Sequence, residues 1–235
     1  MINPRLFWFV WVGLIVYAFF LAPPDNPSET FSLIKRLSTG QWDGINPLIV
    51  SLFNVMGIWP MIYAAVMLFD GRGQTVKAYP FTIGSFGVGA FTILPYLALR
   101  KPGQPFTGQK SLILKLLDSR WTAGAIALGT IPLVLYGLTL GDWSDFAHQW
   151  QTRRFIHVMS LDFCLLWLLF PALMQDDMRR RSVKHPTAFT ALAFIPLLGA
   201  LAYWVVRPHQ AESQGETPAP GDRYATASGP PASSQ

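Results

Sequence analysis

The feature that most limits how this chain can fold is a series of six apolar runs. They cover Leu6 to Ala22, Leu48 to Phe69, Tyr79 to Leu99, Trp121 to Leu140, Phe155 to Met174, and Thr187 to Val206. A helix needs about 20 residues to cross roughly 30 Å of hydrocarbon, which is about the length of each run. Charged residues make up only 13% of the 235 positions, too few for the wetted surface of a soluble domain. The sequence therefore predicts an all-α polytopic membrane bundle with about six transmembrane helices.

The predicted membrane domain covers residues 1–206, and residues 207–235 are expected to form a disordered tail. This tail is rich in Pro, Ala, Ser and Gly, so it cannot bury enough apolar area to offset the entropy of ordering. The first apolar run is rich in Phe and Trp and has no clean small-residue cleavage site before Pro23. It is therefore expected to be an uncleaved anchor rather than a secretory signal.

Cysteine usage and net charge exclude several classes of protein. The chain has one cysteine, Cys164, so no intrachain disulfide or multi-cysteine zinc site is available. The formal charge of +5 is attributed to basic loops beside anionic lipid head groups. No basic run is interleaved with aromatic residues as in nucleic-acid-binding segments, so the expected partners are the lipid bilayer and other integral membrane proteins.

The segment between the first two runs carries the signals of a short helix. It has a candidate cap at Asn26 and a stop at Gly40. Phe31, Ile34 and Leu37 would share one face. Two interpretations stay open, an amphipathic helix that lies on the membrane surface and an ordinary structured loop.

The number of basic residues in the loops on each side of the membrane predicts the orientation of the chain. With six spans, the odd-numbered loops carry 11 Lys and Arg residues and the opposite side carries 7. The positive-inside rule then predicts that the odd-numbered loops face the cytoplasm or stroma.

Two basic loops resemble each other and suggest an internal repeat. The loop from Asp70 to Pro80 aligns with the loop from Asp177 to Pro186, with Arg72 opposite Arg179. Three spans per unit would give a 3+3 repeat with inverted topology, which is common among transporters. The alternative is coincidence, because short basic loops resemble one another.

The fifth run contains an acid, Asp162, about 10 Å below the start of its helix. A carboxylate in hydrocarbon is costly and often marks a proton or ion path, although a protonated Asp that orients two helices is the alternative. Asn54 lies at a comparable depth in the second run and is the predicted partner of Asp162. Together with His157 and Ser160, these two residues form the hypothetical intramembrane polar site.

His157 and Asp162 differ by about 140° around the helix, so they are not expected to form a direct pair. His157 instead shares a stripe with Ser160 and Cys164, which suits helix packing near the membrane surface. No cofactor is predicted. Two facing histidines for a haem are not expected in the bundle, because the other histidines lie in loops or the tail, but His157 as a single ligand to chlorophyll is an alternative.

The loops also contain clusters of charge, interpreted as ion-paired caps at the membrane surface, with a ligand or partner site as the alternative. Their members are Asp70, Arg72, Arg153, Arg154, Asp177 and Arg179. No motif of a metal site or a catalytic site is present in the sequence, so no catalytic residue is predicted and a role other than an enzyme is favoured.

Three stretches, "LFNVMGIWPMIYAAVMLFDGRG", "PFTIGSFGVGAFTILPYLALR" and "RRFIHVMSLDFCLLWLLFPALMQDDMRRR", resemble a multi-pass membrane family of cyanobacteria and chloroplasts with no established activity. The third stretch also resembles the short membrane proteins grouped as DUF2834. This resemblance implies a thylakoid or plasma membrane of a photosynthetic cell and supplies no functional residues.

Three functions follow as hypotheses. The leading one is a non-enzymatic factor that assembles or stabilises a photosynthetic membrane complex. The second is a small secondary transporter or channel that uses Asp162 and Asn54. The third is a membrane protein that handles a pigment or a quinone.

Overall fold

The computed structural model describes residues 3–183 and 186–212, and this part of the chain is all-helical. The predicted tail beyond residue 212 lies outside the described residues. The helices are α1 (Pro4–Val16), α2 (Pro27–Ser38), α3 (Pro47–Asp70), α4 (Tyr79–Val88), α5 (Ala90–Leu99), α6 (Leu112–Leu117), α7 (Arg120–Leu140), α8 (Trp143–Thr152), α9 (Arg154–Arg180), α10 (Pro186–Leu192) and α11 (Leu198–Val206). A π-helical turn, η1 (Tyr17–Leu21), continues α1, and a short 3-10 helix, η2 (Gly71–Gly73), follows α3.

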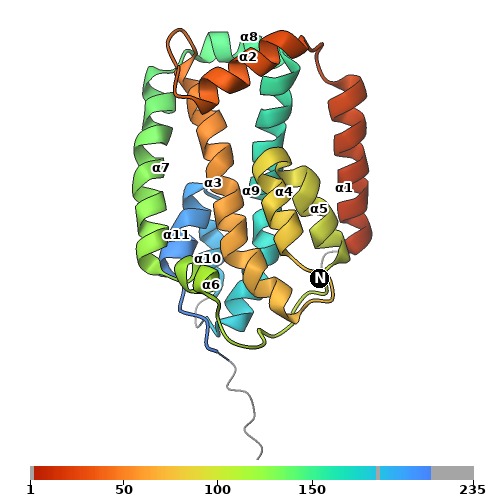
Figure 1. The fold of residues 1–235 in the computed structure, drawn as a ribbon, viewed down its shortest axis with the longest axis vertical. Coiled ribbons are helices and arrows are strands. Elements are labelled where there is room, and N and C mark those ends of the chain that lie inside the picture. The colour runs from red at the N-terminus through yellow and green to blue at the C-terminus, as the bar shows by residue number, and fades with distance from the viewer. Residues whose placement is uncertain (1–2, 184–185, 213–235) are drawn as a thin grey trace, which may run out of the picture.

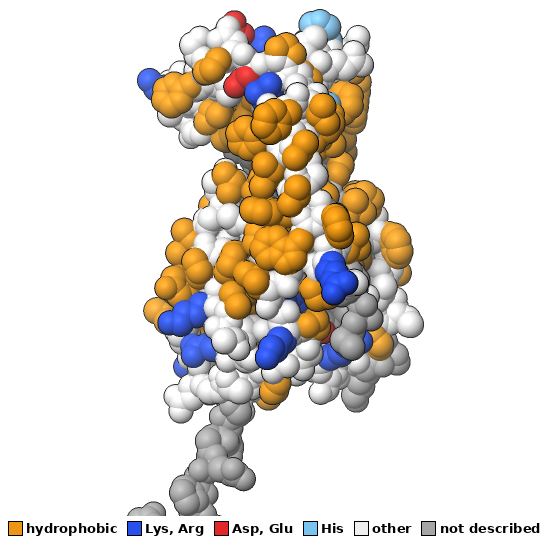
Figure 2. Space-filling view, turned by 90° about the vertical axis from the view of Figure 1, so that its right-hand side faces the viewer, with side chains coloured by type: hydrophobic (Ala, Val, Ile, Leu, Met, Phe, Trp, Pro, Cys, Tyr) orange, Lys and Arg blue, Asp and Glu red, His pale blue; other side chains and the backbone are white. Residues whose placement is uncertain are grey.

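Four of the six predicted spans are single long apolar helices. They are Pro4–Leu21, Pro47–Gly73, Arg120–Leu140 and Arg154–Arg180. Their outer faces carry large apolar side chains such as Phe9 and Trp121, which are 76% and 89% exposed. Figure 2 shows hydrophobic side chains along the middle of one face, with Lys and Arg gathered toward the lower end. Such a surface needs lipid around it, and the chain is an integral membrane protein.

Two amphipathic helices, α2 and α8, lie across one end of the bundle, which we name the α2–α8 end (Figure 1). The helix expected between residues 26 and 40 is confirmed, and Leu37 on it is buried while Phe31 is exposed. The helix α8 was not predicted. Its cap is Asp142, whose carboxylate accepts hydrogen bonds from the backbone N–H groups of Ser144 and Asp145.

The third predicted span is not one helix but a hairpin of two half-length helices, α4 and α5. The chain turns at Gly89, which has a φ of +50°. The two helices face each other closely, because a Cβ at Gly84 would lie 2.8 Å from Thr92 Cγ2. The loops at either end of the hairpin meet, since Gln74 Nε2 donates to the Lys101 carbonyl at 2.6 Å. The hairpin therefore enters and leaves the bundle at the same end.

The sixth predicted span has the same form. Its helices α10 and α11 are separated by a turn that ends at Leu197, with a φ of +59°. Arg207, just after α11, binds Asp177 near the end of α9, so this hairpin also returns to the end where it started. Figure 1 shows both hairpins in the lower half of the bundle, opposite α2 and α8. We name this lower end the Asp70–Asp177 end.

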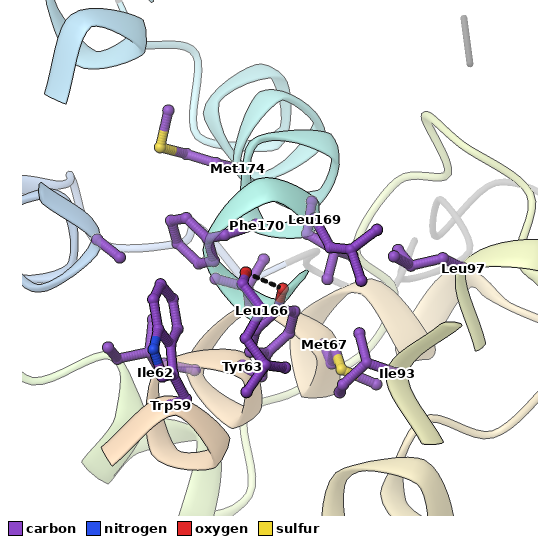
Figure 3. Close-up of a cluster of buried hydrophobic side chains, with 14 of the residues drawn as sticks. Trp59, Ile62, Tyr63, Met67, Ile93, Leu97, Leu166, Leu169, Phe170 and Met174 are labelled. Carbon is purple, nitrogen blue, oxygen red and sulfur yellow. Dashed lines mark hydrogen bonds between the residues drawn. The ribbon is translucent and has the colours of Figure 1, made fainter. Parts of the chain in front are cut away.

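The core lies where α3, α9 and α5 meet (Figure 3). Trp59 and Tyr63 of α3 pack edge-on or tilted against Phe170 of α9, with ring centroids 6.1 and 5.8 Å away. The Tyr63 hydroxyl donates to the Leu166 carbonyl at 2.7 Å, so the one polar atom of this ring is satisfied inside the apolar cluster. This contact fixes α3 against α9 and so positions the upper half of α9, where Asp162 lies.

Candidate intramembrane binding site

Asp162 meets the turn between α4 and α5. Asp162 is only 6% exposed. Its Oδ1 accepts a hydrogen bond from the backbone N–H of Ala90 at 2.7 Å. Ala90 is the first residue of α5, so the carboxylate lies at the positive end of a helix. Within the described residues no hydrogen bond or ion pair reaches the second oxygen, Oδ2.

Gly89 makes this contact sterically feasible. A Cβ at this position would lie 1.8 Å from Asp162 Oδ2 and 2.6 Å from its Cγ. Real side chains do not approach this closely, so any residue with a Cβ would push the carboxylate away from the turn. The positive φ of Gly89 adds a second reason for glycine.

Asp162 lines a cavity of about 590 Å³ between η1, α3, the tip of the α4–α5 hairpin and α9. The walls are mainly apolar and include Phe53, Phe91 and Met159. Asp25 and Arg154 also line the cavity, and Arg154, the first residue of α9, lies about 12 Å from Asp162 along this helix. This volume falls in the range of sites that hold small molecules, about 300–1,000 Å³.

His157 does not join Asp162 but connects three helices. Its Nδ1 lies 2.9 Å from the Trp150 carbonyl and its Nε2 lies 2.8 Å from the Tyr17 hydroxyl. A carbonyl only accepts, so Nδ1 carries the proton and Nε2 accepts from Tyr17. The imidazole also stacks on Trp150, with centroids 4.4 Å apart. Ligation of chlorophyll by His157 stays a prediction, and Nε2 would have to leave Tyr17 to form that bond.

The other two members of the predicted polar site bond to their own helices. Asn54 Nδ2 donates to the Val50 carbonyl at 2.8 Å, and Ser160 Oγ donates to the Ile156 carbonyl at 2.7 Å. The predicted Asn54–Asp162 hydrogen bond is not formed between these described residues. The partner of Asp162 is a backbone amide, which the sequence analysis missed; the signal that could have indicated it is the glycine-rich stretch "GSFGVGA" inside the third apolar run.

A second polar region occupies the Asp70–Asp177 end, far from the cavity. Asp70 accepts hydrogen bonds from the Tyr96 hydroxyl at 2.5 Å and from Arg100 at 3.2 Å. Asp177 accepts from the Tyr203 hydroxyl at 2.7 Å and from Arg207 at 2.9 Å. Each Asp therefore binds a Tyr 26 residues later and an Arg 30 residues later in the chain.

Further ion pairs join these two groups. Arg180 binds Asp70 at 2.6 Å, and Arg100 also binds Asp176 at 2.7 Å. Asp70 and Asp177 therefore lie at the same end of the bundle, which contradicts the inverted topology expected from the sequence. In inverted copies these two residues would lie at opposite ends.

The charge clusters predicted at the surface divide into two kinds. Asp70 and Asp177 are fully buried, and their charges are matched by arginines. Arg72, Arg153 and Arg179 are exposed, and Arg154 is half-buried, with its Nε donating to the Pro23 carbonyl at 2.9 Å.

Asp118, in the loop before α7, extends the ionic network. It binds Arg181 and Lys110, at 2.6 and 2.7 Å. Burial by itself would raise the pKa of the Asp118 carboxyl, but the hydrogen bonds and charges of Lys110 and Arg181 outweigh burial and lower this pKa below its ordinary value. The carboxylate thus stays charged and ties this loop to the end of α9.

The fold and the two polar regions define a helical integral membrane protein in which a buried acid of α9, Asp162, contacts the tip of the α4–α5 hairpin. No protein-family model, curated protein or solved structure matches the chain. The resemblance to a cyanobacterial and chloroplast family therefore stays a prediction.

Proposed function

We propose that this protein is a small secondary transporter or channel in which Asp162 binds a cation or a proton. One observation carries the proposal: the Asp162 carboxylate lines an intramembrane cavity with one oxygen on the Ala90 amide and the other without a described protein partner. A buried carboxylate inside the membrane is costly unless it is neutralised or paired. A transported cation or proton would supply that neutralising charge.

The broken helices support this function. Interrupted helices form the substrate and ion sites of many transporters, because their free backbone groups and helix termini face the ligand. Such breaks are tolerated at membrane depth only where protein or a cavity surrounds them. The break at Gly89 meets this condition, since Gly89 and Phe91 both line the cavity.

We further propose that the chain contains two parallel repeats in place of the inverted ones. The helices correspond in order: α1 with α7, α2 with α8, α3 with α9, and the α4–α5 hairpin with α10–α11. The equal 26- and 30-residue spacings of Tyr and Arg after Asp70 and Asp177 support this correspondence. Each unit of the 3+3 arrangement would then have two spans and one re-entrant hairpin.

The two units differ where the cavity lies. The residue 107 positions before Asp162 is Val55, a buried apolar side chain. The helix α7 of the second unit packs tightly on α3 of the first, because a Cβ at Gly137 would lie 2.5 Å from the Ser51 Cβ. The equivalent space between η1 and α9 holds the cavity. This difference supports one such site, in the space beside Asp162, within the described part of the chain.

Proton flux into liposomes tests the proposed function. We expect the purified protein to speed voltage-driven proton entry, measured with a pH-sensitive dye, above the rate of protein-free liposomes. Asp162→Asn should lower the protein-dependent rate by about tenfold or more, because the ionisable group is lost. Asn54→Ala should stay within about twofold, because Asn54 bonds only within its own helix.

A wild-type rate equal to that of protein-free liposomes would contradict proton transport through Asp162. The assembly factor of a photosynthetic membrane would then be favoured, and it predicts co-purification with a larger complex and no effect of Asp162→Asn. That hypothesis stays a prediction, as does the thylakoid location. Contact with lipid explains the exposed apolar helix faces as well as contact with a partner protein does. An assembly role also gives no function to Asp162 Oδ2, which has no described protein partner.

A further inference from the structure

The chemistry of the cavity restricts what it can bind, beyond the transport role proposed above. Asp162 lines the cavity, and its Oδ2, which has no described protein partner, is an acceptor when the carboxylate is ionised. Two neighbouring donors are already used: the Ala90 amide binds Asp162 Oδ1, and the Ser85 hydroxyl donates to the Thr82 carbonyl at 2.7 Å. A ligand at this depth must therefore bring hydrogen-bond donors, positive charge, or both.

This arrangement disfavours the other ligand classes. A quinone presents carbonyl acceptors, and the Ala90 amide and the Ser85 hydroxyl beside Asp162 are already engaged as donors. An organic anion would meet Asp162 directly, because the arginine of the lining, Arg154, lies about 12 Å away along α9. Both ligands would pay an electrostatic or desolvation cost that a cation avoids.

The apolar walls suit a hydrophobic body rather than a small hydrated ion. The residues that line the cavity include Phe53, Phe86, Phe91 and Phe155, together with Met56 and Met159. Aromatic faces attract organic cations, and methionine adapts to irregular apolar shapes. The volume of about 590 Å³ leaves room for such a body next to Asp162.

We propose that this cavity binds a monovalent organic ammonium ion with an apolar body, its N–H groups directed at Asp162 Oδ2. The assignment rests on the proposed function, since it names the class of cation that the transporter carries. We expect the ion to enter past the polar lining residues Arg154 and Asp25, on the α2–α8 side of the cavity.

A matched pair of ligands tests this assignment on the purified protein in detergent. The probes are 4-phenylbutylamine, which is protonated at pH 7, and 4-phenylbutanol, a neutral molecule of the same shape. We expect calorimetric titration to show that the amine binds at least about tenfold more tightly than the alcohol, because only the amine pairs with a buried carboxylate. Asp162→Asn should reduce this preference to about twofold or less.

Two glycine substitutions show whether binding occurs in the cavity. Gly57 lines it, and a Cβ there would meet nothing within 4 Å, so Gly57→Leu fills the space without a clash at its first atom. We expect this variant to weaken binding of both probes. Gly129→Leu is the matched control, because Gly129 also has nothing within 4 Å but is exposed on α7. Size-exclusion chromatography and thermal unfolding verify that each variant is folded.

Equal binding of the amine and the alcohol to the wild-type protein would overturn the assignment. So would a preference that survives Asp162→Asn, or amine binding unchanged in Gly57→Leu. The result is separable from the flux assay, which contains no amine. Amine-selective binding without proton flux contradicts proton conduction but supports the ligand class, and proton flux without amine selectivity does the reverse.

Discussion

At the scale of single residues, the sequence identified Asp162 but not what it touches. Its depth in an apolar run marked it as costly, and helical geometry correctly placed it apart from His157. Its partner, the Ala90 amide, could not be found by matching side-chain types, because every residue has a backbone N–H group. What frees this amide is the chain break at Gly89, whose signal is a glycine-rich stretch inside an apolar run.

Replacement of Gly89 should separate its role from that of the glycines around it. Gly89→Ala is expected to lower the free energy of unfolding by about 2 kcal/mol or more, because alanine at positive φ is strained and its Cβ would overlap Asp162. Gly87→Ala is the control, since a Cβ there meets nothing within 4 Å. Thermal unfolding in detergent measures both, and equal stability of the two variants would contradict the structural role of Gly89.

At the scale of helices, apolar length predicted four spans correctly and could not describe the other two segments. About 20 apolar residues can form one helix that crosses the bilayer or two half-length helices that turn back. Hydropathy is the same in both cases. The difference arises from Gly89 and Leu197 at the turns and from the Tyr–Asp and Arg–Asp contacts that return each hairpin to its starting end. These contacts join residues that lie 26 or 30 positions apart.

At the base of the α10–α11 hairpin, the ion pairs of Asp177 should contribute more to stability than its hydrogen bond from Tyr203. Asp177→Asn is expected to destabilise the protein by about 3–5 kcal/mol, because Arg207 and Arg181 would keep buried charges without their shared carboxylate. Tyr203→Phe removes one hydrogen bond to Asp177 and should cost about 1–2 kcal/mol.

Arg179→Ala provides the control for this cluster. Arg179 is 69% exposed and lies 3.6 Å from Asp176, so its loss should change stability by less than about 1 kcal/mol. Denaturation in mixed detergent micelles compares the three variants. An effect of Asp177→Asn no larger than that of Arg179→Ala would show that the buried cluster does not hold the hairpin.

At the scale of the whole molecule, the hairpins change which loops share a side of the membrane. With four spans, twelve of the described Lys and Arg residues lie toward the Asp70–Asp177 end: Arg5, Arg72, Lys77, Arg100, Lys101, Lys110, Lys115, Arg120, Arg179, Arg180, Arg181 and Arg207. Four lie toward the α2–α8 end: Lys35, Arg36, Arg153 and Arg154. We propose on this basis that the Asp70–Asp177 end faces the cytoplasm. The six-span count divided these residues more evenly because it placed the two ends of each hairpin on opposite sides.

Cysteine labelling in intact cells tests this arrangement. In a Cys164→Ser background, Thr75→Cys and Gln109→Cys flank the α4–α5 hairpin at exposed positions, and Gln151→Cys lies on α8. A membrane-impermeant maleimide is expected to label only Gln151→Cys, with the other two labelled after permeabilisation. Labelling of Thr75→Cys and Gln109→Cys from opposite sides would support six spans and contradict the re-entrant hairpin.

The ion pairs across the two halves also set an order in which the molecule can be completed during synthesis. Arg100 binds Asp70, which is made before it, and Asp176, which is made 76 residues later. Asp70 in turn binds Arg180, which is made 110 residues after it. A nascent chain that ends before α9 would thus hold these buried charges only partly matched, so the first half reaches its final form only when the second half emerges.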